Sequence, residues 1–386
     1  MDLELQSLTT LEGVHPPEWN ALAGGNPFLR HEFLIALERS GCIGPRTAWQ
    51  PRHIVARDHE GRLVGALPLY VKYDSRGEFV FDWSWADAYE RAGGIYYPKL
   101  VASVPFTPAT GRRLLVHESA DERSVAARLL EGARELQDEI DASSIHFLFP
   151  TDAERGMLAA AGFLARKSCQ FHWHNRAYTD FDDFLSRFSS EKRKKARRER
   201  RRVAEAGVRF EHLAGDQLSA EDWDVVFEFH ARTFLRRGRP PYLNRAFFAE
   251  IARTMPENIV VILARHGGTP IATAICFRGA DSLYGRYWGS LADFHSLHFE
   301  ACYYQGIDYC IREGLATFEP GTQGEHKISR GFTPSATWSW HSLRDPGFHR
   351  AVQQFLTHET TQVDAYMDYL EDHVPYRRDL RDTELT

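Results

Sequence analysis

Two segments with the same pattern of hydrophobic and polar positions occur roughly 200 residues apart. In each, an apolar run leads into a polar, glycine-containing turn and a second apolar run, which is typical of a β-hairpin. Ala56-Arg57 and Ala264-Arg265 occupy the same place in the two patterns. This self-similarity predicts a tandem duplication. The predicted strands are 53–57 and 63–71 in the first half, and 259–265 and 271–277 in the second.

The pattern that follows each hairpin predicts an aromatic-rich strand, then a helix, then another strand. In the first half these are residues 79–99, an apolar stripe from Val125 to Ile140, and 144–149. In the second half they are 283–288, 300–312 and 316–318. Strand–helix–strand units after an antiparallel meander predict an α/β (α+β) fold, in which each half has a mixed, mainly antiparallel sheet flanked by helices. This is the layout of a GNAT acyltransferase domain.

A long basic helix is predicted over residues 180–206. Its segment 191–202 contains nine Lys or Arg residues and two Glu residues, while Ala196, Glu199 and Val203 share a different face. A solvated helix with charges of both signs is the ordinary explanation of such a run. Here the like charges repel at i,i+4 spacing, so the excess of positive charge favours an anionic partner. The predicted anion-binding residues are Lys194, Arg197, Arg198 and Arg201.

The length of 386 residues exceeds what one core usually organises, so we expect two domains. The first is predicted over 1–178. The second is predicted over 179–374, beginning with the basic helix and ending with an amphipathic helix. Residues 375–386 form a polar tail.

The composition favours a soluble cytoplasmic protein. The net charge is −6, the five cysteines include no CxxC pair, and no apolar run is long enough for a membrane span. The acidic N-terminus lacks the features of a secretory signal.

Residues 321–334 place ionisable groups of four kinds between two apolar runs. Glu325, His326, Lys327 and Arg330 lie among glycines 321, 324 and 331. Glycine permits tight turns and close approach to a ligand. A solvated loop is the plain alternative. We expect this segment to be a site at the end of a sheet, with the side chains of residues 325–327 facing a cavity.

Several motifs closely resemble a bacterial family of predicted N-acyltransferases named for peptidoglycan biosynthesis or recognition, the FemAB-like branch of the GNAT superfamily. The resemblance covers nearly the whole chain. It implies two tandem GNAT-like domains and transfer of an amino acid from aminoacyl-tRNA to a peptidoglycan-precursor amine. The motifs are Asn26-Pro27-Phe28, 77–83, 96–100, 104–111, Tyr284-Gly285-Arg286-Tyr287-Trp288-Gly289, 297–304 and 323–332.

Acyl transfer to an amine needs a base, a group that stabilises the oxyanion and a held acyl carrier. The candidate catalytic residues are Glu325, His326, Lys327 and Glu300. Lys327 and Arg330 are also candidates for holding a phosphate, a carboxylate or the oxyanion. Substrate binding is assigned to Arg286, Tyr284, His298, Tyr303, Arg330, Asp82, Trp83, Tyr97 and Lys99.

The acyl donor is the main open alternative. The (Gln/Arg)-x-x-Gly-x-(Gly/Ala) loop that binds coenzyme A in GNAT enzymes is missing after residues 283–288. Coenzyme A is therefore not favoured, and no cofactor is expected. Aminoacyl-tRNA or acyl carrier protein is the expected donor partner, and a small-molecule or peptide amine the acceptor. The alternatives are an acetyl-CoA-dependent N-acetyltransferase and a non-catalytic protein that binds nucleic acid or cell-wall fragments. No metal is expected, since His295, His298, Glu300 and His326 lack a standard zinc spacing.

Overall fold

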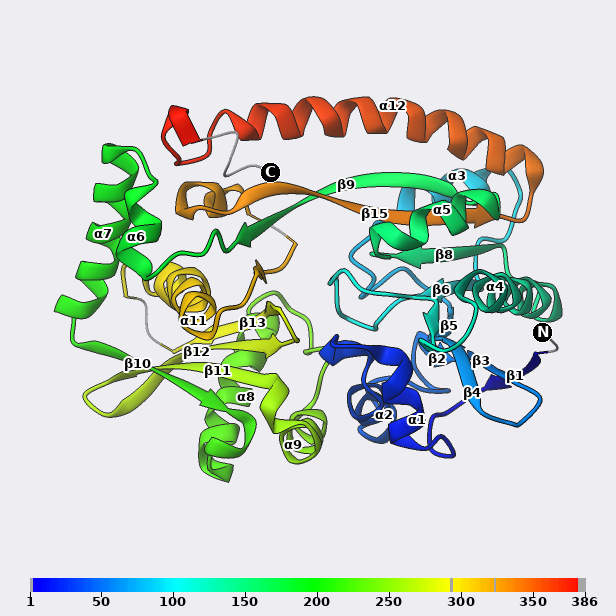
Figure 1. Ribbon diagram of the computed structural model, residues 1–386, viewed down its shortest axis with the longest axis horizontal. Helices are drawn as coiled ribbons and strands as arrows, with labels where there is room; N and C mark the ends of the chain where they lie inside the picture. The colour runs from blue at the N-terminus through cyan, green and yellow to red at the C-terminus, as the bar shows by residue number, and fades with distance from the viewer. Residues whose placement is uncertain (1–2, 292–293, 323, 381–386) are drawn as a thin grey trace. The chain divides into compact units, whose positions relative to one another are not determined.

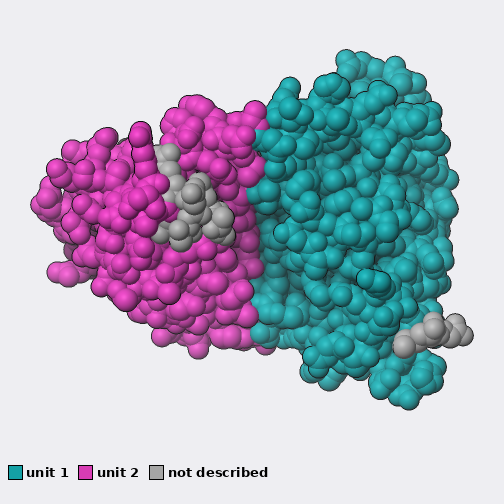
Figure 2. Space-filling view, turned by 45° about the horizontal axis from the view of Figure 1, so that its top comes forward, with its two compact units in different colours: residues 1–168, 336–364 teal, residues 169–335, 365–386 magenta. Residues whose placement is uncertain are grey.

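The computed structural model describes residues 3–291, 294–322 and 324–380. These residues divide into two compact units, drawn in different colours in Figure 2. Unit 1 comprises 1–168 and 336–364, and unit 2 comprises 169–335 and 365–386. Three elements run from one unit into the other along the chain: β9 (Leu164–His174), β15 (Thr333–Leu343) and α12 (Pro346–Glu371). Gln323 of the charged motif and residues 381–386 of the predicted tail lie outside the described residues.

The units differ from the predicted domains in three respects. Residues 169–178 group with unit 2 and not with the first half. Residues 375–380 belong to unit 2, where Tyr376 is buried against Phe188, and do not form a separate tail. Residues 336–364 group with unit 1, although the sequence pattern assigned them to the second domain. The cause is strand pairing. β15 pairs antiparallel with β8 (Ser144–Leu148), with Ser339 opposite Leu148 and Leu343 opposite Ser144. A long-range pairing of this kind leaves no trace in local periodicity.

Unit 1 contains two groups of strands. The first is antiparallel, in the order β1-β3-β4-β7, and the second has the order β2-β5-β6-β8 with β15 beside β8. β6 and β8 pair in parallel, and the other strand pairs in these two groups are antiparallel. The mixed, mainly antiparallel arrangement agrees with the predicted fold class. The bounds are β1 Glu4–Leu8, β2 Trp49–Pro51, β3 His53–Arg57, β4 Leu63–Leu67, β5 Leu69–Lys72, β6 Lys99–Ala102 and β7 Leu115–Val116.

The helices of unit 1 follow from clear sequence signals. Asp121 caps α4 (Glu122–Glu139) by accepting a hydrogen bond from Ser124 N. The apolar stripe of α4, including Val125 and Leu129, packs with Ile54 of β3 in one buried cluster. The other helices are α1 Pro16–Ala23, α2 His31–Arg39, α3 Trp83–Arg91 and α5 Asp152–Ala160.

The aromatic-rich strand predicted within residues 79–99 is wrong. Residues Trp83–Arg91 of this segment form helix α3, whose Trp85, Ala86 and Tyr89 pack against one cluster. These positions follow helical spacing, and Asp82 stands at the N-cap position. The density of aromatic residues suggested a strand because such residues favour strands in general. Here the packing of one helical face against the core stabilises a helix instead.

Unit 2 is built on strands in the order β10-β11-β12-β13-β14, with β9 beside β14. All these pairs are antiparallel except β13 with β14. Its hairpin β11–β12 carries a bulge between Ala264 and Arg265, and the hairpin β3–β4 of unit 1 carries one between Ala56 and Arg57. This shared irregularity fits the predicted duplication. The bounds are β10 Val208–Ala214, β11 Ile259–His266, β12 Thr269–Arg278, β13 Ser282–Ser290 and β14 Thr317–Glu319.

Helices cover both faces of this sheet (Figure 1). Tyr287 of β13 packs on Phe248 and His230, from α9 (Arg245–Thr254) and α8 (Ala220–Leu235). On the other face lie α7 (Ser190–Glu205) and α11 (Gln305–Glu313). Before α11 come the short helix α10 (Leu297–Phe299) and a π-helical turn over Glu300–Tyr304. Within the described ranges, no helix is both long and apolar enough to cross a membrane.

The single helix predicted over 180–206 is two helices, α6 (Phe181–Ser186) and α7. The break lies at Phe188 and Ser189. Phe188 is buried, and its backbone forms a bridge with Tyr376. Ser189 is extended, with ψ 151°. Tertiary packing of one aromatic side chain thus interrupts a sequence that is helical on both sides.

A buried chain of hydrogen bonds runs through the core of unit 1. His146 and His341 face each other with 2.6 Å between their Nδ1 atoms. Their Nε2 atoms lie 2.7 Å and 2.8 Å from the hydroxyls of Ser144 and Ser339. Burial lowers the pKa of His146 to about 3 and holds the pKa of His341 well below its usual range.

This histidine pair predicts an acid-labile core. Below about pH 6.5 the two histidines are protonated in the unfolded chain but remain neutral in the folded protein. The free energy of unfolding therefore falls as pH decreases. Each histidine contributes about 1.4 kcal/mol per pH unit. Between pH 6.5 and 5, unfolding of the wild-type protein should bind up to two protons more than unfolding of a variant in which both histidines are leucine. Urea unfolding at a series of pH values measures this. Exposed His59→Leu is the control, and an unchanged pH slope in the double variant contradicts the assignment.

Candidate functional site

Strands β13 and β14 of unit 2 separate at a point where the sequence predicted a site. They pair only over the first residues of β13, with Tyr284 opposite Glu319. A bulge in the β12–β13 ladder lies next to this point. Ile275 pairs with Tyr287 and Cys276 with Gly285, so Arg286 is the extra residue. Bulges often re-aim a side chain beside an active site. Burial lowers the pKa of Arg286.

Residues Glu325–Arg330 form a 3₁₀ turn that follows this opening. Glycines with positive φ stand at both ends, Gly324 at 113° and Gly331 at 94°. A side chain at Gly331 would also meet the Phe184 ring at 2.5 Å. Both positions therefore require glycine. The turn is anchored by Lys327, whose Nζ donates to Gly321 O at 2.5 Å.

Lys327 is buried with little to compensate its charge. It is 2% exposed, and burial lowers its pKa to about 7, with the nearby Arg286 cation acting in the same direction. The pKa of Lys99 in unit 1 is shifted in the opposite direction. Burial also penalises its charge, yet Glu78 and Asp82 outweigh this and raise its pKa. A lysine that changes its charge near neutral pH is a candidate for a role in proton transfer or charge stabilisation.

His326 lies beside Lys327 and pairs with Tyr303 of the π-helical turn. The Tyr303 Oη–His326 Nε2 distance is 2.7 Å. His298 packs edge-on against Tyr303, and its ring centroid lies 6.0 Å from that of His326. Partial burial of its ring, with the Arg330 and Lys327 cations nearby, lowers the pKa of His326, and burial lowers that of His298 to about 4. Both imidazoles are therefore neutral at neutral pH, so each carries a lone pair that can accept a proton.

Arg330 connects this turn to the basic helix α7. Its Nη2 donates to Glu199 Oε1 at 2.8 Å, and the two side chains are 3% and 9% exposed. The other oxygen of Glu199 accepts from Tyr304 Oη at 2.7 Å. Arg330 Nη1 also donates to the backbone carbonyl of His326 at 2.6 Å, and its guanidinium lies 3.4 Å from the centre of the Phe299 ring. Arg330 is thus a positioning residue.

The two predicted acidic catalytic residues do not join this group. Glu300 is buried, and its Oε1 accepts from Gln305 Nε2 of α11 at 2.7 Å and from Arg200 Nε of α7 at 3.1 Å. Glu325 is exposed and accepts from Tyr366 Oη at 2.7 Å. The sequence predicted that the side chains of residues 325–327 face one cavity. In the structure Lys327 is buried, whereas Glu325 and His326 are exposed, so the three side chains do not share one environment.

The predicted anion-binding residues lie on the exposed side of α7. Lys194, Arg197, Arg198 and Arg201 are all exposed. Arg197 pairs with Asp182 at 2.8 Å, and Arg201 lies 3.6 Å from Glu205. Lys194 and Arg198 form no ion pair with another described residue. This face therefore keeps positive charge available to an anion.

A cavity of about 360 Å³ lies at the end of β13. Aromatic side chains dominate it, among them Trp288, His298 and Phe299, and Arg236 contributes a cation. It therefore offers ring faces and positive charge next to His326. Among the described residues, no group of three His, Cys, Asp or Glu side chains could hold a metal ion.

The predicted residues of unit 1 form a separate group. Lys99 Nζ donates to Asp82 at 2.5 Å, to Glu78 at 2.8 Å and to Ser75 at 2.8 Å, and all four residues are buried. Tyr97 is half-buried, with its hydroxyl 2.9 Å from that of Ser75. Asp82 and Lys99 are thus held by partners within unit 1.

Trp83 of unit 1 points outward. It is 52% exposed and stacks on Phe81 with ring centroids 4.8 Å apart. Its neighbour Asp82 is fixed inside the unit, so the exposed aromatic pair has a rigid base. Such a pair offers a flat apolar platform to a ligand.

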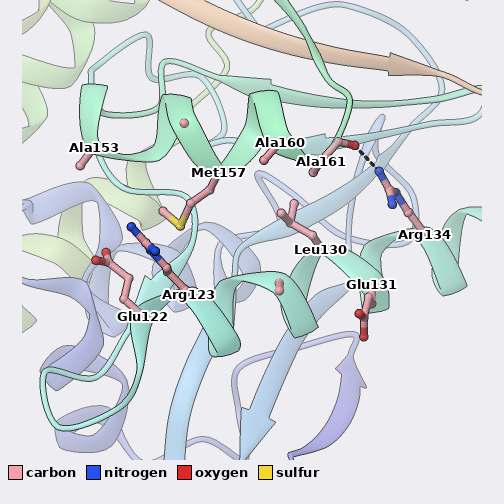
Figure 3. Close-up of a pocket in the computed structure, with 11 residues that line it drawn as sticks. Glu122, Arg123, Leu130, Glu131, Arg134, Ala153, Met157, Ala160 and Ala161 are labelled. Carbon is pink, nitrogen blue, oxygen red and sulfur yellow. Dashed lines mark hydrogen bonds between the residues drawn. The ribbon is translucent and has the colours of Figure 1, made fainter.

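A larger groove of about 770 Å³ lies between α4 and α5 of unit 1 (Figure 3). Leu130 and Met157 form its apolar part, and Arg134 closes one end by donating to Ala161 O. No predicted site residue lines it. Its charged side chains are exposed and it lacks the buried ionisable groups of the other two regions, so we do not assign the chemistry to it.

Sequence reasoning missed Glu199, Tyr304, Ser75 and Glu78. A signal for Glu199 was present, since a carboxylate stood on the same helical face as Ala196 and Val203. Buried acidic residues need partners, and a carboxylate on an apolar face indicates one. Ser75 and Glu78 lie in an irregular loop, where no periodicity marks burial.

Comparisons with known proteins agree on the family and the fold. The model of a FemAB-like family, described as peptidoglycan biosynthesis/recognition, matches residues 10–378. Among solved structures, FemX has a TM-score of 0.53 at 13% identity, covering 91% of this chain and 100% of that one. The C-terminal DUF2156 domain of a putative lysylphosphatidylglycerol synthetase from Agrobacterium fabrum gives 0.50 at 14%, covering 82% and 94%. L-PGS from Bacillus licheniformis gives 0.50 at 11%, covering 86% and 98%. No curated protein matches the chain.

These matches confirm the predicted resemblance and the fold class of two tandem GNAT-like domains. At such low sequence identity the solved structures show the fold alone.

The buried Arg330–Glu199 pair yields a prediction about stability. Removing one partner leaves the other charge buried and unpaired, which typically costs about 3–5 kcal/mol. Arg330→Met should therefore destabilise unit 2 by about that amount, and adding Glu199→Gln should recover a large part of the loss. A double-mutant cycle from urea unfolding measures the coupling. Arg197→Gln removes an exposed pair and is the matched control. Additive effects of Arg330→Met and Glu199→Gln contradict the predicted coupling.

Proposed function

The chain belongs to the FemAB-like family of peptidoglycan biosynthesis and recognition and is an acyltransferase, and we propose that it transfers an acyl or aminoacyl group from an anionic carrier to an amine. The proposed carrier is aminoacyl-tRNA or acyl carrier protein. One observation carries the proposal: a lysine with a pKa of about 7 and a neutral histidine lie together in unit 2, joined through Arg330 and Glu199 to a cationic helix.

The proposed chemistry forms an amide bond. The amine nitrogen attacks the carbonyl carbon of the carrier's ester or thioester, a C–N bond forms, and the C–O or C–S bond breaks. His326 is the proposed base. With its Nε2–H donating to Tyr303 Oη, the Nδ1 lone pair accepts the proton that the amine loses. The departing carrier oxygen or sulfur then takes up a proton.

Lys327 is the proposed partner of the oxyanion. A buried ammonium interacts strongly with developing negative charge because little water screens it. Arg286, at the bulge beside it, supports the same negative charge. Tyr284, Tyr303 and His298 are proposed to form the surroundings of the substrate in unit 2. Glu325 and Glu300 are no longer proposed as bases, since their partners lie away from His326 and Lys327.

The proposed carrier follows from the charge on α7. Lys194, Arg197, Arg198 and Arg201 suit a polyanion, and the loop that would hold the pyrophosphate of coenzyme A is missing from the sequence. We therefore propose no bound cofactor and a reaction in the cytoplasm, where both macromolecular carriers occur. In unit 1, Trp83 and Tyr97 are proposed to contact the acceptor, while Asp82 and Lys99 hold them in place.

The cationic face of α7 gives one test. Changing Lys194, Arg197, Arg198 and Arg201 to Gln should weaken carrier binding, because fewer counterions are displaced. The slope of log affinity against log salt should fall in magnitude by about three for tRNA. Fluorescence titration at several salt concentrations measures both. Changing Arg123, Arg128, Arg134 and Arg155 of α4 and α5 to Gln is the control of equal charge. Equal losses in both variants would show that only net charge matters.

The pH dependence of transfer separates the roles of Lys327. As an oxyanion partner, it must carry its proton, so kcat/KM should fall as pH rises through about 7, its lowered pKa. Lys327→Arg keeps the charge and should move this descending limb well above neutral pH. Lys327→Met should cost about 10²–10³-fold at pH 6.5. If the wild-type rate instead rises through pH 7 and Lys327→Met abolishes the rise, Lys327 is the base and the assignment is wrong.

A further inference from the structure

A second cavity in unit 2, about 270 Å³ in volume, lies beneath α7. Its walls come from α7, the start of β10, the π-helical turn and the start of α11. It shares no lining residue with the cavity at the end of β13. The lining residues are Arg200, Arg201, Val203, Ala204, Val208, Phe210, Glu300 and Gln305.

The carboxylate of Glu300 is only half satisfied. The residue is 3% exposed, and its Oε1 accepts from both Gln305 and Arg200. Its Oε2 is buried and has no hydrogen-bond partner among the described residues. An unsatisfied buried acceptor typically costs about 1–3 kcal/mol. Because this oxygen has almost no exposed surface, a donor bound in the cavity would remove the cost only once the Glu300 carboxylate turns toward it.

The opposite charge is supplied by Arg201. Its Nε lies 3.6 Å from Glu205 Oε1, which is too long for a hydrogen bond, and its side chain is 68% exposed. Its guanidinium therefore remains able to bind a carboxylate at the cavity mouth. Arg200 is already engaged, with Glu300 at 3.1 Å and with Asp308 at 3.7 Å.

The rest of the lining is apolar. Val203 and Val208 are buried members of one core cluster, and Phe210 packs against it. The volume is slightly below the ~300–1,000 Å³ of pockets for drug-sized ligands. This size suits a small metabolite.

We propose that this cavity binds a free α-amino acid with an aliphatic side chain. Its ammonium group donates to Glu300 Oε2, its carboxylate binds Arg201, and its side chain contacts Val203, Val208 and Phe210. This combination satisfies the buried oxygen, uses the available cation and covers the apolar wall. Glu300 also opens the π-helical turn that carries Tyr303 and Tyr304, and such turns are frequent at functional sites. The proposal does not depend on the transfer reaction, and it shares with the proposed carrier site only Arg201, for which the two ligands would compete.

Calorimetric titration of the full chain tests it with three probes. L-Leucine carries both charges, 3-methylbutylamine lacks the carboxylate, and 4-methylpentanoate lacks the amine. L-Leucine should bind with one-to-one stoichiometry and at least tenfold more tightly than either analogue. No heat of binding at millimolar L-leucine, or equal affinity for L-leucine and one analogue, overturns the proposal and leaves water as the occupant.

Variants locate the binding. Glu300→Gln should weaken L-leucine binding at least tenfold, and Arg201→Gln should weaken it while leaving the affinity for 3-methylbutylamine unchanged. Ala204→Phe fills the cavity from an exposed position, so it should abolish binding without depending on a core change. Glu191→Gln and Arg198→Gln, on α7 outside the cavity, are the matched controls. Unchanged L-leucine affinity in folded Ala204→Phe protein, checked by circular dichroism, places the ligand elsewhere and overturns the assignment.

Discussion

The buried carboxylate of Glu199 is the constraint on which the rest of unit 2 depends. It stands in the most positively charged segment of the chain, yet it faces inward and accepts from Arg330 and Tyr304. Arg330 in turn holds the backbone of His326. The cationic face of α7 and the 325–330 turn are therefore one connected structure. An anion bound on α7 would lie on an element whose position is fixed relative to His326 and Lys327.

Two buried lysines show how the protein uses charge differently in its two units. Lys99 has two carboxylates and a hydroxyl around it, which keep it charged and make it a structural centre. Lys327 has one carbonyl and lies near a second cation, so its charged form is costly. Because its pKa is lower in the folded protein than in the unfolded chain, it costs stability below its usual pKa, most of all below about pH 7. Such a cost is typical of functional residues, where activity and stability oppose each other.

Much of the fold could be predicted from local patterns, and much of the site could not. The two hairpins, the stripe on α4 and the glycines around the 325–330 turn each left a clear signal, because each is set by residues close in sequence. The assignment of residues 336–364 to unit 1 depends on the pairing of β15 with β8, and the break between α6 and α7 depends on the burial of Phe188. The roles of Glu300 and Glu325 likewise depend on distant partners, Arg200 and Tyr366. The chemical type of each residue was enough to select the candidate catalytic residues. Tertiary contacts were needed to distinguish those that lie together from those held by other partners.

In the proposed reaction, a macromolecular carrier delivers an acyl group to the Lys327–His326 pair. The most direct measurement follows a radiolabelled acyl group from charged tRNA, and in parallel from acylated carrier protein, into amines of a peptidoglycan-precursor extract. We expect labelled amide with one of these carriers, and loss of that product in Lys327→Met and His326→Ala proteins that still bind the carrier. Transfer from acetyl-CoA alone, or undiminished transfer by both variants, would contradict the proposed reaction.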